Sequence, residues 1–169
     1  WARLIGRVAV RAFSMLASLP VFIVLNMIGM RSMIRDMRSR LVGHELTPKL
    51  VAHAFPEGLD GLTPGLHQKV FEGLNEQIQT ARFMHPNQIR FLQMLPPRPE
   101  FSEQATETEI RRSNRFLLAL LFMSGHQTPR CRKLIARAEM DLGEDEVDRV
   151  HQEIDDAIHD LTPLTRSWA

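Results

Sequence analysis

The longest apolar stretch of the chain lies near its start. The 19 residues from Ala12 to Met30 carry no charged side chain. As an α-helix they would be about 28 Å long, close to the roughly 30 Å hydrocarbon core of a bilayer. Pro20 would kink such a helix, and two serines and an asparagine make it less apolar. The stretch predicts a membrane-spanning helix, and an interfacial helix or a buried core helix are the alternatives.

Arginines flank this apolar run on both sides. The first three are spaced four residues apart, so a helix places them on one face. An arginine-rich, acid-poor stretch is typical of helices at the headgroup layer and of organelle targeting sequences. Because arginine holds phosphate oxygens well, we expect the flanking arginines to contact anionic lipid headgroups. These candidates are Arg3, Arg7, Arg11, Arg31, Arg35, Arg38 and Arg40.

Prolines and glycines interrupt the chain after the apolar run. We expect a connector over residues 41–65, where three prolines stand among four glycines and should break any long helix. Thr47-Pro48 and Thr63-Pro64 are each typical of a helix start. The first helix would be short and end by Phe55, whereas the second would run to about Met84. A further short helix is expected over residues 87–95, before a proline cluster.

Residues 66–169 are expected to form a helical domain. Thr106 and Glu109 have the spacing of a capping box, which predicts a helix start. The eight apolar residues from Phe116 to Met123 are too few to cross a bilayer and indicate a buried helix. Two more helices are predicted, from Thr128 to Leu142 and from about Glu144 to Leu161. No stretch alternates apolar and polar residues in the manner of a strand, so the fold class is all-α.

The sequence contains few residues arranged for chemistry. His151, Asp155 and His159 are spaced four apart on one expected helix, a spacing that can hold a metal. No second cluster completes a coordination shell, so we interpret them as part of a solvated acidic face. Cys131, the one cysteine, has basic neighbours that would lower a thiol pKa, but packing is the simpler interpretation. We therefore expect no catalytic residues, no metal and no cofactor.

Charge is distributed unevenly, although the net charge of the chain is only +1. Residues 1–55 contain eight basic and two acidic residues, a net of +6. Residues 139–160 contain one basic and ten acidic residues, a net of −9. The basic front is suited to an anionic surface, and the acidic rear to water or a basic partner. The low total charge and the few aromatic residues argue against nucleic-acid binding.

Together these patterns predict a basic anchor over residues 1–40, a connector over 41–65 and a helical domain over 66–169. Our leading hypothesis is a non-catalytic accessory subunit of a membrane complex, held by a single span. The arginine-rich front favours the mitochondrial inner membrane, and hence a respiratory-chain or ATP-synthase assembly. Its partners would be other subunits and anionic phospholipid. The alternative is a soluble α-helical protein-binding module in which residues 12–30 form the core.

Overall fold

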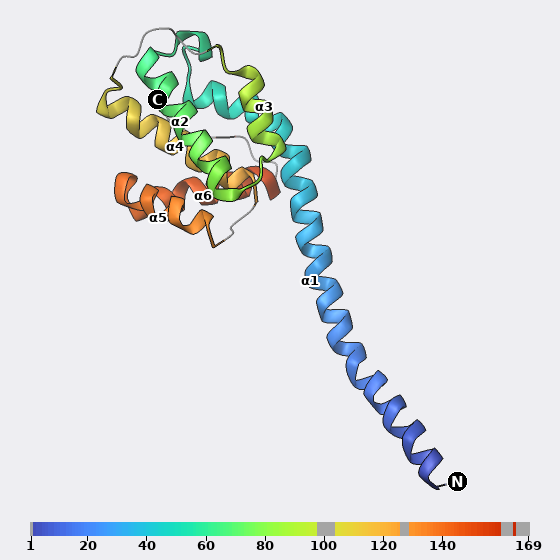
Figure 1. The fold of residues 1–169 in the computed structure, drawn as a ribbon. Coiled ribbons are helices and arrows are strands. Elements are labelled where there is room, and N and C mark those ends of the chain that lie inside the picture. The colour runs from blue at the N-terminus through green and yellow to red at the C-terminus, as the bar shows by residue number, and fades with distance from the viewer. Residues whose placement is uncertain (1, 98–103, 126–128, 160–163, 165–169) are drawn as a thin grey trace. The chain divides into compact units, whose positions relative to one another are not determined.

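The computed structural model is all-α (Figure 1). It describes the backbone of residues 2–97, 104–125, 129–159 and 164, and the side chains of these residues from Pro20 onward. The chain divides into two compact units, residues 1–37 and residues 38–169. The helices are α1 (Ala2–Ala54), α2 (Pro64–Ala81), α3 (Pro86–Met94), α4 (Glu107–Met123), α5 (Cys131–Leu142) and α6 (Glu144–His159), with a 3-10 turn at Leu59–Gly61.

Helix α4 is the centre of the second unit. All eight residues from Phe116 to Met123 are buried, and the helix contacts α2, α3, α5 and α6. A helix that is apolar on every side must be covered on every side, which explains this central position. The Phe116 ring lies 5.0 Å from the ring of Phe55 and 4.7 Å from that of Phe91, measured between centroids. The prediction of a buried helix here is confirmed.

The expected helix break at Pro48 is wrong. Helix α1 continues through Thr47 and Pro48 to Ala54, so the first part of the expected connector is helical. A proline inside a helix removes one hydrogen bond and costs about 3 kcal/mol. Burial offsets that cost, because a stripe of α1 residues on both sides of the proline enters the core of the second unit. This stripe consists of Leu46, Leu50, Val51 and Ala54.

A buried polar junction joins α1, α3 and α4. The Asn87 side-chain amide donates to the backbone carbonyls of Ser39 and Met123, at 3.2 Å in each case. The Ser39 hydroxyl donates to the same Met123 carbonyl. Gly43 makes room for this arrangement, because a Cβ there would lie 2.1 Å from the Asn87 amide nitrogen. The polar contacts therefore fix where α1 lies against the other two helices.

Two helix starts predicted from the sequence are confirmed, and one carboxylate links them. The Thr63 side chain accepts from the Leu66 amide at the start of α2. Thr106 and Glu109 form the predicted capping box at the start of α4. The Thr63 hydroxyl also donates to the Glu109 carboxylate. Together, this bond and the Thr106 backbone N–H lower the pKa of Glu109.

Helices α5 and α6 complete the second unit. Gly143 separates them with a φ of 94°, a value that glycine adopts readily. The buried face of α6 follows the predicted spacing and contains Val147, Val150, Ile154, Ala157 and Ile158. Its first turn carries three acidic residues, which suit the positive end of the helix dipole. The expected α5 cap at Thr128 and the expected end of α6 at Leu161 lie outside the described residues.

Candidate functional site

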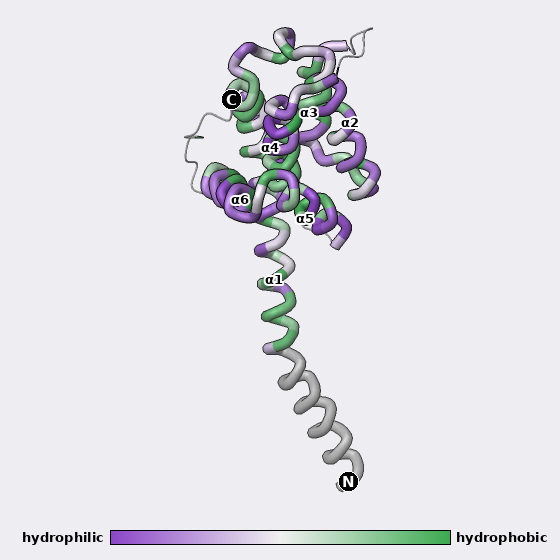
Figure 2. The backbone as a smooth tube through the Cα atoms, turned by 90° about the vertical axis from the view of Figure 1, so that its left-hand side faces the viewer, coloured by the Kyte–Doolittle hydropathy of each residue, from purple (hydrophilic) through white to green (hydrophobic). Residues whose placement is uncertain are grey.

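The described part of the first unit exposes large apolar side chains. Figure 2 shows the hydrophobic colouring along this part of α1. The exposed fraction of each of these side chains lies between 49% for Ile23 and 65% for Met33. Such a density of exposed apolar surface is unusual for a protein in water and marks a surface that something else covers. The residues are Val21, Phe22, Ile23, Val24, Leu25, Met27, Ile28, Met30, Met33, Ile34 and Met37.

From Val21 to Met30 the helix is apolar on every side. Successive residues of an α-helix turn by about 100°, so these ten positions cover the whole circumference. Asn26 is the one polar side chain among them. A helix that is apolar all round belongs in a protein core or in a membrane. None of the described core residues of the second unit comes from this segment, so that core does not include it.

From Met30 onward the helix has an apolar face and a separate basic face. Met30, Met33, Ile34 and Met37 follow the spacing of one helical face. Arg31 and Arg35 are four residues apart and lie on another face. A basic helix with a separate apolar face is typical of segments that lie in a membrane surface. This face was not predicted from the sequence, although the spacing of its apolar residues would have indicated it.

Four of the seven arginines predicted to contact lipid have described side chains. Arg31, Arg35, Arg38 and Arg40 are all exposed. The Arg38 guanidinium donates to the backbone carbonyl of His159 at 3.4 Å, which links α1 to the end of α6. The other three candidates, Arg3, Arg7 and Arg11, lie outside the described side chains.

The predicted membrane span falls only partly within the described side chains. In the part of the chain that the structure describes, we find no helix with the length and apolar character needed to cross a membrane. The apolar run begins at Ala12, and the side chains of residues 12–19 are outside the described set.

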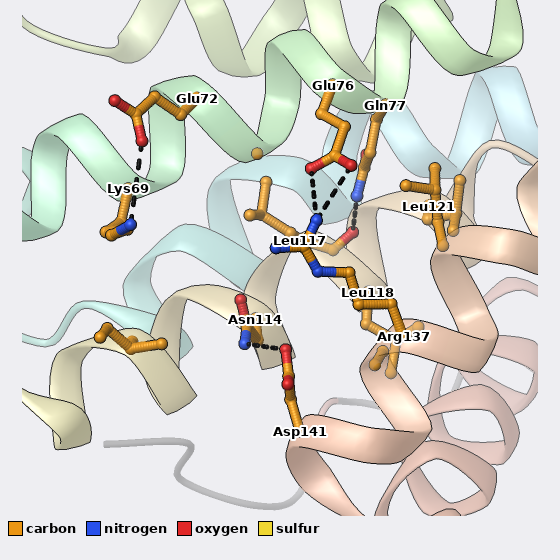
Figure 3. Close-up of a pocket in the computed structure, with 14 residues that line it drawn as sticks. Lys69, Glu72, Glu76, Gln77, Asn114, Leu117, Leu118, Leu121, Arg137 and Asp141 are labelled. Carbon is orange, nitrogen blue, oxygen red and sulfur yellow. Dashed lines mark hydrogen bonds and ion pairs between the residues drawn. The ribbon is translucent and has the colours of Figure 1, made fainter.

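A groove lies between α2, α4 and α5 of the second unit (Figure 3). Its volume is about 220 Å³. Leu117, Leu118 and Leu121 of α4 line it, together with Leu134 and Ala138 of α5. The groove could not be foreseen from the sequence, because its walls come from three helices that are distant along the chain.

Charged and polar side chains pair with one another around the groove. The Arg137 guanidinium of α5 reaches Glu76 of α2 at 3.1 Å, and Figure 3 shows this contact beside Leu117. The Asn114 amide donates to the Asp141 carboxylate at 3.0 Å. Apolar walls and a charged rim suit contact with another protein. Among the described residues, the lining contains no histidine, cysteine or serine that would serve as a nucleophile or base.

The residues considered for metal or thiol chemistry have structural contacts. The His151 ring stacks on Phe122 at 4.4 Å between centroids. The Nδ1 atom of His159 lies 2.9 Å from the backbone oxygen of Asp155 and 3.3 Å from its carboxylate. Cys131, the first residue of α5, is buried. Within the described ranges, no group of three or more histidine, cysteine, aspartate or glutamate residues could hold a metal ion.

Comparisons with known proteins provide no further guide to function. No protein-family model matches the sequence, and no curated protein and no solved structure is significantly similar to it. The function must be inferred from the exposed apolar helix, its arginines and the groove.

Proposed function

We propose that the protein is a non-catalytic accessory subunit of a membrane complex. Its N-terminal helix is the anchor, and residues 38–169 form a helical module that contacts a larger subunit. The observation that carries the proposal is the exposed segment from Val21 to Met30, which is apolar on every side. The proposed setting is an organelle membrane, in particular the mitochondrial inner membrane, where the chain would belong to a respiratory-chain or ATP-synthase assembly. The arginine-rich, acid-poor front supports this setting.

Leaving this segment exposed to water costs free energy. Full burial of one large aliphatic side chain stabilises a protein by about 1.5–3 kcal/mol. Eight large apolar side chains between Val21 and Met30 are about half exposed or more. Covering them would therefore contribute on the order of 10 kcal/mol, a gain that lipid or apolar partner helices can provide. The predicted single span, which uses the whole run from Ala12 to Met30, is the form of anchor that we favour.

The flanking arginines support a lipid setting. In the proposed anchor, Arg3, Arg7 and Arg11 lie at one end of the apolar run, and Arg31, Arg35, Arg38 and Arg40 lie beyond the other. Guanidinium groups at such positions can reach phosphate groups while their aliphatic stems stay in an apolar layer. The anionic headgroups of phospholipids are therefore the proposed small-molecule partner, and no cofactor is required.

The helical module provides the proposed contact with other subunits. Its groove presents leucines inside a charged rim, the usual composition of a protein contact site. Two carboxylates of the groove have structural partners, since Glu76 pairs with Arg137 and Asp141 accepts a hydrogen bond from Asn114. A docking role is therefore favoured over catalysis.

A second candidate is a soluble helical protein-binding module. The sequence predicted that residues 12–30 form the core of such a module, but the described side chains from Val21 to Met30 are exposed. In this second candidate, apolar helices of a partner protein, rather than lipid, cover residues 21–30. The methionines favour it, because Met27, Met30, Met33 and Met37 are exposed and flexible methionine side chains are frequent at adaptable protein-binding surfaces.

Extraction of native membranes at alkaline pH separates the two candidates. The first predicts that the protein stays in the membrane pellet and runs within a large complex on a native gel in mild detergent. Mass spectrometry of that band would name the partner subunits. If the protein is extracted as a small species, the membrane proposal is wrong and the soluble module remains.

A pair of variants tests whether residues 21–30 are responsible. Val24→Asp combined with Ile28→Asp places two charges on exposed positions and should release the protein into the extract. Phe71→Asp, an exposed apolar position on α2, is the control and should leave the protein in the pellet. Equal release of both variants would contradict an anchor at residues 21–30.

A further inference from the structure

We infer that residues 30–37 pass through the headgroup layer of an anionic membrane, with the methionine face against the lipid and the arginine face toward phosphate groups. This inference rests on the proposed membrane anchor and assigns the contact with anionic lipid to one segment of it. The preceding segment is apolar on every side, whereas residues 30–37 are apolar on one side alone. The first pattern suits immersion in an apolar medium, and the second suits its boundary.

The apolar face of this segment is well defined. Met30, Met33, Ile34 and Met37 recur at intervals of three and four residues, so they form one stripe along the helix. Each of these side chains is exposed by half or more. A stripe of this width can contact lipid between the headgroups while the charged side chains remain in the headgroup layer.

The arginine face favours anionic lipid. Arg31 and Arg35 are four residues apart and share one side of the helix, and Asp36 is the single acidic residue of the segment. Arginine presents several donors in a planar fork that matches phosphate oxygens. Basic residues beside a membrane are attracted to anionic lipids by about 1 kcal/mol each. Charge complementarity therefore favours an anionic over a neutral membrane surface.

The acidic helix cannot provide this attraction. Residues 139–160 have a net charge of −9, whereas residues 1–55 have a net charge of +6. Since an anionic surface repels the first segment and attracts the second, the basic residues of the N-terminal segment carry the interaction.

The methionines provide a test within the chain itself. Full-length protein is reconstituted into vesicles of phosphatidylcholine, with or without phosphatidylglycerol, and treated with dilute hydrogen peroxide. Mass spectrometry then gives the oxidation rate of each methionine, since oxidation requires access to the sulfur. Met27 reports on the anchor, and Met33 and Met37 report on the surface segment, residues 30–37. Met140 on α5 is the accessible reference, since it is 80% exposed, the highest value among the described methionines.

The inference predicts a specific pattern of protection. Met27 is protected in both kinds of vesicle, whereas Met33 and Met37 are strongly protected in the anionic vesicles alone. Arg31→Gln combined with Arg35→Gln should remove most of that protection, by up to about thirtyfold for two arginines. The same loss of charge at the exposed α5 residues Arg132 and Lys133, both changed to Gln, is the control and should change nothing.

Failure of the inference and failure of the anchor give different results. If Met27 is oxidised as fast as Met140 in both kinds of vesicle, the membrane anchor itself is wrong. If Met27 is protected but Met33 and Met37 react as Met140 does, the anchor stands and the surface segment is wrong. Equal protection of Met33 and Met37 in neutral and anionic vesicles would overturn the choice of anionic lipid.

Discussion

At the scale of single residues, the second unit depends on a few close polar contacts. Asn87 is fully buried and its amide holds the carbonyls of Ser39 and Met123. A buried amide of this kind is stable only if its neighbours leave it enough space. Gly43 provides that space on α1, so a small residue there is required by packing rather than by backbone conformation.

Gly43→Ala is expected to destabilise the second unit by about 1–3 kcal/mol, the usual cost of overpacking. The added Cβ would lie 2.1 Å from the Asn87 amide nitrogen, so the amide must move and weaken its two hydrogen bonds. The better helix propensity of alanine recovers at most about 1 kcal/mol. Urea unfolding followed by circular dichroism measures the difference.

Gly29→Ala is the matched control for that substitution. It lies on the same helix, and a Cβ there meets no atom within 4 Å. Its urea midpoint should equal that of the unmodified protein or exceed it slightly. A Gly43→Ala protein as stable as the Gly29→Ala protein would show that the Asn87 junction does not limit packing.

Glu109 should make the free energy of unfolding of the second unit decrease at acidic pH. The hydrogen bond from Thr63, with the Thr106 backbone, lowers the pKa of Glu109 in the folded protein. A lowered pKa means that the ionised carboxylate stabilises the fold above the unfolded-state pKa, and that this contribution is lost as the pH falls through the folded-state pKa. Glu109→Gln should therefore reduce the loss of stability on acidification.

The measurement is the urea midpoint as a function of pH on the acidic side of neutrality. Glu107→Gln, two residues away in the same first turn of α4, removes the same charge and should keep the acid-side loss. Parallel pH profiles for Glu109→Gln and the unmodified protein would rule out this role for the carboxylate.

At the scale of helices, the sequence predicted the features that depend on residues close together along the chain. The capping box at Thr106 and the apolar run from Phe116 to Met123 each contain their own signal, and both predictions are confirmed. The path of α1 through Pro48 could not be predicted, because it depends on burial of Leu46 and Leu50 against helices far along the chain. The groove was missed for the same reason, since three separate helices form it.

Pro48→Ala is expected to stabilise the second unit by about 1–3 kcal/mol. The proline lacks the N–H that an α-helix needs at this position, and alanine restores it. The gain in stability should be smaller than the full cost of a helical proline, because the substitution also removes the packing of the half-buried proline ring. Pro56→Ala is the contrasting variant, since Pro56 lies exposed in a turn, where loss of proline should lower stability slightly. Thermal unfolding of the two variants should therefore shift in opposite directions, and a shift in the same direction would contradict the cost assigned to a proline within α1.

At the scale of the whole chain, the two units differ in what they leave exposed. The described part of the first unit leaves its large apolar side chains uncovered, whereas the second unit buries most of its apolar residues around α4. The proposed roles follow this difference. The first unit requires an apolar environment, and the second can contact a partner through its groove without giving up its own core.

A bulky side chain in the groove should weaken assembly without unfolding the protein. Ala138 of α5 lines the groove and is partly buried, so Ala138→Trp would fill the space between α2, α4 and α5. The groove is open to one side, which lets the indole remain partly in water. We therefore expect the thermal midpoint to change little and the share of protein in the large native-gel complex to fall severalfold. Ala136→Trp, two residues away on the exposed face of the same helix, is the control and should assemble as the unmodified protein does. Equal assembly of both tryptophan variants would show that the groove is not the docking site, while leaving the membrane anchor untouched.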